Sequence, residues 1–155
     1  MFGKLIRYAA SMLPLSLALR AWLYRISGID LGNAVSIDRG IQITEAPHIH
    51  IGDRVTISAG VSLLGEITSV HSRLETEFNI RKAADIVIED DAYIGVKATI
   101  LPGVRIGRMA TIGANTLVIS DVPPFSVVLG VPGRVVMVRP HPGQGAPPTQ
   151  GPTGS

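Results

Sequence analysis

The chain has 155 residues, of which 46% are hydrophobic, 17% are charged and only 5% are aromatic. Its formal net charge is +2 and it has no cysteine, which excludes disulfides, thiolate metal sites and a cysteine nucleophile and does not favour nucleic acid as a partner. This length allows one domain with its own core, and the shortage of aromatic side chains indicates an interior built from aliphatic residues.

Residues 1–28 differ from the rest of the chain because they are both apolar and basic. The apolar stretch 8–19 has twelve residues, against about 20 that a helix needs to cross a bilayer, so no membrane span is predicted. Pro14 predicts a break between two short helices. We expect residues 1–28 to form an amphipathic helical extension that packs on the domain or lies in a membrane interface with its arginines toward lipid phosphates. Four basic residues precede the first acidic one, Asp30: Lys4, Arg7, Arg20 and Arg25.

Aliphatic residues recur every six positions over much of the chain. This period suits neither a helix nor an alternating strand, and it predicts a solenoid of brief strands and corners in which three sides close a triangular coil. Glycine follows several repeat positions, as expected where the chain turns at a corner. We expect Ile88 to stack on Ile106, Ile94 on Ile112 and Ile100 on Val118. An earlier block repeats at Leu31, Ile37, Ile43, Ile51, Ile57 and Leu63, with a bulge around Pro47.

The repeat is interrupted between Leu63 and Ile88. Residues 64–85 are polar and charged, so we expect them to protrude from the solenoid as a loop, and a loop of this length inside a compact domain is commonly functional. The loop contains His71, whose imidazole is suited to general-base catalysis near neutral pH. The tail, residues 140–155, is rich in Pro and Gly and is expected to be disordered.

The repeat resembles that of the hexapeptide-repeat acyltransferases, in particular the galactoside, maltose and polysaccharide O-acetyltransferases. The most specific segments are 86–124 and 127–136, which look like the closing coils of that family and its glycine-x-proline-x-basic exit. The resemblance covers residues 29–139. It implies an all-β solenoid, a left-handed parallel β-helix of about four triangular coils, with a short N-terminal helical segment and a disordered C-terminal tail. The implied activity is acetyl-CoA-dependent transfer of an acetyl group to a hydroxyl of a sugar or polysaccharide precursor.

The resemblance also implies roles for individual residues. His71 would be the general base, with Glu66 or Glu75 orienting its imidazole, and the sequence leaves the choice between these carboxylates open. Arg73 and Arg81 in the loop are expected to bind the substrate, and no metal is expected. The residues expected to bind acetyl-CoA lie at corners of the closing coils and at basic positions suited to phosphate oxygens: Tyr93, Gly95, Lys97, Gly113, Ala114 and Arg134.

The sequence departs from the family pattern at two places. Ser58-Ala59-Gly60 stands where the family often has a substrate-binding asparagine, and Ser120 stands where lysine is common. Contacts to the sugar are therefore expected to differ from those in the family, and Lys97 or Arg139 is expected to supply the missing positive charge.

A homotrimer with sites between subunits is expected, with His71 of one chain facing Tyr93 and Ala114 of another. The family is trimeric, and aliphatic residues on the faces of the prism would be exposed on a monomer. We expect a cytoplasmic protein whose residues 1–28 are able to contact the inner face of the membrane. The aliphatic face residues are Val96, Leu117, Val127 and Leu129.

Two other functions fit the same fold. One is a non-catalytic trimeric scaffold in polysaccharide biosynthesis. The other is zinc chemistry, because the γ-type carbonic anhydrases share this fold and bind zinc through three histidines. Outside the tail only His48, His50 and His71 are available, without the five-residue spacing of that family. His48 and His50 are two apart on an expected strand, so both are expected to point to solvent.

Overall fold

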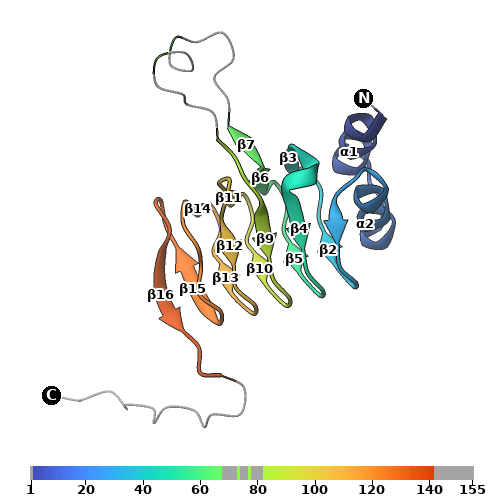
Figure 1. Ribbon diagram of the computed structural model, residues 1–155. Coiled ribbons are helices and arrows are strands. Elements are labelled where there is room, and N and C mark those ends of the chain that lie inside the picture. The colour runs from blue at the N-terminus through green and yellow to red at the C-terminus, as the bar shows by residue number, and fades with distance from the viewer. Residues whose placement is uncertain (1, 68–72, 74–76, 78–81, 142–155) are drawn as a thin grey trace, which may run out of the picture.

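The structure, a computed structural model, describes residues 2–67, 73, 77 and 82–141, which form a triangular prism with two helices at its N-terminal end (Figure 1). The helices are α1 (Phe2–Met12) and α2 (Leu17–Ile26), so the predicted break near Pro14 is confirmed. Ser16 begins α2 as its N-cap, since its hydroxyl accepts a hydrogen bond from the Leu19 amide at 3.4 Å. No helix in the described part of the chain has the length and apolarity needed to cross a membrane.

Three parallel sheets make the walls of the prism, and successive strands pass from sheet A to sheet B to sheet C. Sheet A contains β1 (Asp30–Leu31), β4 (Ile49–Ile51), β9 (Ile86–Ile88) and β12 (Arg105–Ile106). Sheet B contains β2 (Ser36–Ile37), β5 (Thr56–Ile57), β10 (Tyr93–Ile94), β13 (Thr111–Ile112) and β15 (Ser126–Leu129), with β16 (Arg134–Val138) antiparallel at its edge. Sheet C contains β3 (Gln42–Thr44), β6 (Ser62–Leu64), β11 (Thr99–Ile100) and β14 (Leu117–Val118).

The predicted stacking of the repeat is confirmed. Ile88 pairs with Ile106, Ile94 with Ile112 and Ile100 with Val118, each in the next coil. These side chains are buried in one aliphatic core, where each fully buried isoleucine stabilises the fold by about 1.5–3 kcal/mol. Sheets A, B and C thus enclose four complete coils, and the expected solenoid of triangular coils is confirmed.

Glycines after the repeat positions are needed for a different reason from the one expected. Gly95 and Gly107 lie outside the left-handed region of φ, whereas Lys97 and Met109, two positions later, have φ of 57° and 55°. A Cβ atom at Gly95 would lie 2.7 Å from the backbone nitrogen of Ala114 in the next coil. Glycine is therefore required because the stacked backbones approach closely, while other residues make the left-handed turn.

The predicted excursion leaves the prism at the corner between sheets C and A. Its described base is a short antiparallel ladder of β7 (Glu66–Ile67) and β8 (Lys82–Ala83), in which Glu66 pairs with Ala83. At the corner one coil earlier, the predicted bulge around Pro47 is a 3-10 turn, Ala46–His48. Residues 142–155 of the predicted tail lie outside the described residues.

The two helices form a cap that Arg20 fastens to the first coil. Arg20 is 4% exposed, and its guanidinium donates hydrogen bonds to four backbone carbonyls, namely those of Ala10, Leu13, Leu15 and Ile37, at 2.9–3.2 Å. Of the two expected arrangements of residues 1–28, Arg20 therefore takes part in packing on the domain and does not point toward lipid phosphates. Its planar group instead joins the end of α1, the connection between the helices and β2.

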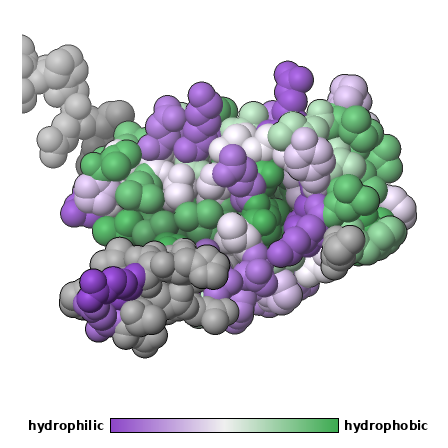
Figure 2. Space-filling view, turned by 90° about the horizontal axis from the view of Figure 1, so that it is seen from above, coloured by the Kyte–Doolittle hydropathy of each residue, from purple (hydrophilic) through white to green (hydrophobic). Residues whose placement is uncertain are grey.

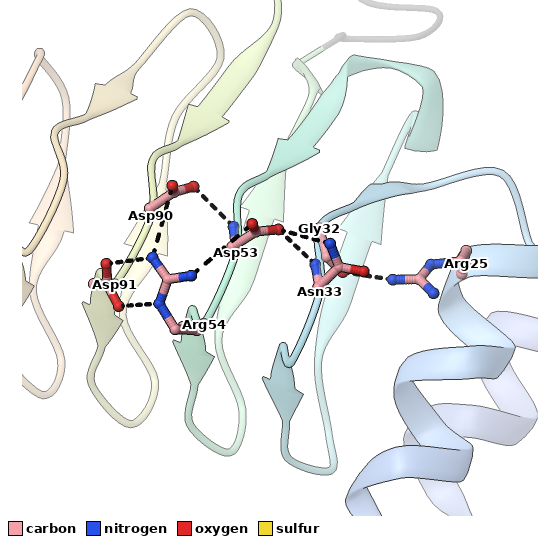
Figure 3. A network of polar contacts seen from close by, with 7 residues as sticks. All are labelled: Arg25, Gly32, Asn33, Asp53, Arg54, Asp90 and Asp91. Atoms are coloured by element: carbon pink, nitrogen blue, oxygen red, sulfur yellow. Dashed lines mark hydrogen bonds and ion pairs between the residues drawn. The ribbon is translucent and has the colours of Figure 1, made fainter.

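Carboxylates also join neighbouring coils along the corner between sheets A and B (Figure 3). The carboxylate of Asp53 accepts a hydrogen bond from the Asn33 amide at 2.7 Å, and that of Asp90 accepts one from the Asp53 amide at 2.9 Å. Arg54 binds Asp91 through two parallel hydrogen bonds of 2.7 and 2.8 Å. The hydrogen bond from Arg54 holds the pKa of the Asp91 carboxyl below its usual value.

Candidate functional site

The corner between sheets B and C forms a continuous edge, here called the B–C edge, made of residues 58–61, 95–98, 113–116 and 129–134. Backbone hydrogen bonds run along it from coil to coil. The Lys97 amide donates to the Ala59 carbonyl at 2.9 Å, the Asn115 amide to Val96 at 2.9 Å, and the Leu117 amide to Gly130 at 3.1 Å. The sequence repeats therefore place residues that are far apart along the chain on one rigid line.

Tyr93 stands on sheet B beside this edge. Its side chain is 42% exposed, and its hydroxyl accepts a hydrogen bond from the Ser58 hydroxyl at 3.2 Å. Strand pairing places it between Thr56 and Thr111 of the neighbouring coils. The ring thus presents an aromatic surface next to the edge, with its polar end already bound to the protein.

Lys97, Ala114 and Arg134 lie exposed on the B–C edge. Within the described residues, the guanidinium of Arg134 makes one hydrogen bond, to the carbonyl of Gly133 at 3.1 Å, and neither Arg134 nor Lys97 is in an ion pair there. Unpaired cations on an exposed edge are suited to binding phosphate groups. The structure thus places on one edge, two coils apart, the basic residues that the resemblance implies for acetyl-CoA.

Gly95 and Gly113 are on the same edge, but their packing accounts for them. Gly95 is buried beneath the corner of the next coil, and a side chain at Gly113 would collide with Leu129. Gly95 is therefore required for coil stacking because its close neighbours are backbone atoms, whereas at Gly113 the close atom is the end of the flexible Leu129 side chain.

The base of the excursion, at the corner between sheets C and A, holds the described part of the predicted catalytic group. Glu66 is fixed through its backbone: its amide donates to the Thr44 hydroxyl at 3.3 Å, and its carbonyl accepts from that hydroxyl at 3.2 Å. Arg73 forms an ion pair with Glu77 at 2.8 Å. The other predicted residues of the loop, His71, Glu75 and Arg81, lie outside the described residues, so their roles stay predictions.

Within one chain, sheet C separates the two groups of predicted site residues. Its strands β6 and β11 leave the B–C edge and lead toward the corner that carries the excursion. Tyr93 and Arg134 are thus on one edge of the prism, while Glu66 is on another. A single chain does not unite the expected cofactor residues with the described base of the expected catalytic loop.

A carboxylate–imidazole pair that the sequence reasoning missed lies at the base of the excursion. Nδ1 of His48 is 2.6 Å from Oδ1 of Asp85, and this hydrogen bond lowers the pKa of the Asp85 carboxyl. The imidazole of His48 is 38% exposed. His50 pairs with Asp30 at 3.0 Å. Both histidines are accessible, as expected, but carboxylates orient them.

The signal for this pair lies in the register of the coils. Ile49 pairs with Ile86, so the residue before each strand, His48 and Asp85, must be neighbours. They are 37 residues apart because the excursion is inserted between them, and only an alignment of the repeats across the interruption would have found them. No group of three or more metal-ligating side chains occurs in residues 2–67, 73, 77 and 82–141.

Comparison with protein families identifies the repeats. The family described as bacterial transferase hexapeptide (six repeats) matches residues 85–120, and the hexapeptide repeat of succinyl-transferase matches residues 49–64. These two ranges lie on either side of the excursion. The family matches therefore cover regular coils on both sides of the excursion.

Among curated proteins, the serine acetyltransferase of Bacillus licheniformis is 37% identical over 110 residues, which are 71% of this chain and 46% of that enzyme. The chain spans less than half the length of such relatives. Among solved structures, a hexapeptide-repeat acetyltransferase of Vibrio cholerae complexed with acetyl coenzyme A gives a TM-score of 0.72 at 26% identity, covering 88% of this chain and 84% of that one. A galactoside acetyltransferase in complex with coenzyme A gives 0.65 at 26% identity, covering 88% and 78%.

Proposed function

The chain belongs to the hexapeptide-repeat acetyltransferase family, and from this we propose that it transfers an acetyl group from acetyl-CoA to a hydroxyl of a sugar or polysaccharide precursor. The choice of a sugar over serine is supported by coverage. The galactoside enzyme matches most of both chains, whereas the serine acetyltransferase of Bacillus licheniformis matches over less than half of its own length.

The observation that carries this proposal is the composition of the B–C edge. Lys97 and Arg134 offer cationic groups for phosphates, and Tyr93 offers an aromatic surface beside them. These residues fit an extended, anionic donor such as acetyl-CoA, which supplies the acetyl group as an activated thioester. Bound along the edge, the donor would be held by the exposed side chains of several coils.

A sugar hydroxyl needs a base to accept its proton during attack, and we propose an imidazole for this step. The resemblance favours His71 in the excursion. Within the described residues His48 is the other candidate, since Asp85 faces its Nδ1 and leaves Nε2 to accept the proton when Nδ1 carries the hydrogen. A proton taken up at Nε2 would be stabilised by the Asp85 carboxylate.

We further propose a homotrimer, because the two groups of site residues lie on different edges of one prism. Association of prisms side by side would bring the B–C edge of one chain to the excursion of the next. Val96 and Leu129, which are part of the edge, are 42% and 46% exposed. Burial of these aliphatic side chains between prisms would favour such an assembly.

The test measures release of coenzyme A from acetyl-CoA with a panel of sugars. We expect Arg134→Gln to raise the KM for acetyl-CoA about tenfold with little change in kcat. The proposed role of Arg134 is to bind the phosphates of the donor, and it has no contact with the reacting atoms in that role. Arg105→Gln, an exposed arginine bound to Glu89 on sheet A, is the matched control and should behave as the wild type.

The identity of the base is tested with three histidine variants. His71→Ala should lower kcat by about 10²–10⁴-fold if it is the base, and His48→Ala should do so if the described pair is. His50→Ala is the control, because His50 is an equally exposed imidazole paired to Asp30. A wild-type chain that neither binds acetyl-CoA nor acetylates any sugar would overturn the proposal and favour the scaffold function.

A further inference from the structure

The helical cap exposes an apolar surface at the N-terminal end of the prism. Figure 1 shows α1 and α2 side by side across this end, and Figure 2 shows hydrophobic residues gathered over it. Exposed fractions range from 44% for Leu19 to 78% for Phe2. The large apolar side chains exposed on the cap are Phe2, Leu5, Tyr8, Met12, Leu13, Leu17, Leu19, Trp22 and Ile26.

In α1 the large apolar side chains point outward, whereas in a helix on the surface of a soluble protein they point toward the core. Its large apolar residues recur at spacings of three and four along the outer face, at Phe2, Leu5, Tyr8 and Met12. Its inner face instead carries small residues: Ala10 and Ser11 are buried. A surface helix normally turns its apolar stripe toward the core. The exposed apolar face of α1 is therefore suited to contact with an apolar surface outside this chain.

The second helix also exposes an apolar stripe. Leu19, Trp22 and Ile26 are exposed at spacings of three and four, while Arg20 and Tyr24 are buried and Leu23 packs against the core. Because Arg20 is buried with its donors satisfied by backbone carbonyls, this orientation is fixed. The helix cannot rotate its apolar side inward without breaking these hydrogen bonds.

The charge of the cap indicates which apolar phase would cover it. Residues 2–29 contain four basic side chains and no Asp or Glu. Arg20 is buried, but Lys4 and Arg25 are exposed and Arg7 is half-buried. Apolar residues, a tryptophan and a tyrosine together with exposed cations are the composition of helices that lie in the interface of an anionic membrane. A second copy of the cap would instead bring like charges together.

We propose that the outer face of the cap docks on a lipid surface that carries anionic headgroups. Helices of 11 and 10 residues lie on such a surface and do not cross it. In the homotrimer, an element that rests on the proposed function, parallel prisms direct three caps the same way, and simultaneous contact strengthens the binding.

Docking would also place the base of the excursion, where the acceptor is proposed to react, near the membrane. A groove of about 600 Å³ lies between α1 and β3, lined by Lys4 and Tyr8 of the cap and reaching Glu66 at the base of the excursion. An acceptor sugar carried on a lipid would therefore meet the cap first and the excursion next.

The test is co-sedimentation of the full chain with vesicles of phosphatidylcholine alone and of phosphatidylcholine with phosphatidylglycerol. We expect binding to the anionic vesicles that weakens with added salt. The double substitution Leu5→Glu and Trp22→Glu should weaken binding by at least about tenfold, since it places charge in the docking face. Ile119→Glu, at a residue 47% exposed elsewhere on the prism, is the control and should bind as the wild type does.

Several outcomes would overturn the proposal. If the wild-type chain stays in the supernatant with both vesicles, the cap does not dock on lipid. If light scattering then shows a larger assembly that the double variant dissolves, a second copy covers the face instead. Acetyl transfer to a soluble sugar is measured in parallel and should be equal in the wild type and the double variant. A wild-type chain that binds the anionic vesicles but transfers no acetyl group would therefore count against the proposed function alone.

Discussion

The prism and the helical cap are stabilised in different ways. In the prism, the same small contact is repeated: aliphatic residues stack from coil to coil, and no single side chain carries a large share of the core. In the cap, one buried arginine joins three segments, and most of the large apolar residues lie outside, with Tyr24 as a buried exception. The comparison shows that a repetitive core can be read from a periodic sequence, whereas an element attached to it depends on one specific contact.

The largest effect is expected in the prism. Ile94→Ala removes a fully buried side chain from the aliphatic ladder and should lower the free energy of unfolding by about 2–5 kcal/mol, in a single transition of the whole prism. Chemical denaturation followed by circular dichroism measures this. Ile119→Ala, at an exposed position, serves as control and should change it little.

A smaller and local effect is expected in the cap. Arg20→Met leaves four carbonyls without their donor and should destabilise the packing of residues 2–28 on the prism by about 2 kcal/mol. Hydrogen exchange should become faster in α1 and α2 while the sheets stay protected. Arg20→Lys should give an intermediate result, because one ammonium group cannot reach all four carbonyls. Equal acceleration in the sheets would mean that cap and prism are one cooperative unit.

The smallest effect is expected on the corner between sheets A and B. Arg54 lowers the pKa of the exposed Asp91 carboxyl, so the ion pair contributes stability above the usual carboxyl pKa and loses it as the pH falls through the lowered value. The difference in Tm between the wild type and Asp91→Asn should therefore be present at pH 7, begin to decline near the usual carboxyl pKa of about 4, and vanish only at a pH below the lowered pKa of Asp91. Added salt should also reduce it. A difference that persists in acid would contradict the role of the ion pair.

The sequence alone predicts the coils but not their attachments. The stacking of Ile94 on Ile112 follows from the six-residue period, because every coil obeys the same geometry. The burial of Arg20 has no local signal: its partners are carbonyls, which every residue possesses, and only the packing of both helices brings them to one point.

The same difference applies to the candidate site. The corner position of Lys97 follows from the six-residue period, whereas Arg134 begins β16, the antiparallel strand after the last regular coil, and its place is implied only by the resemblance. The pair of His48 and Asp85 could not be found from spacing along the chain, because an insertion separates its members. Sequence patterns describe the repeated part of such a site well, and they fail where its chemistry depends on a break in the repeat.

The register across that break has a consequence for how such proteins diversify. Four residues connect sheet C to sheet A at the corners 45–48 and 101–104, and the excursion occupies the equivalent corner between β6 and β9. The coils on both sides nevertheless stay aligned, since Ile49 pairs with Ile86 and Ile51 with Ile88. The excursion can therefore be lengthened, shortened or replaced without disturbing the register of the coils, and under the proposed function such a change would alter the acceptor side of the site while leaving the B–C edge in place.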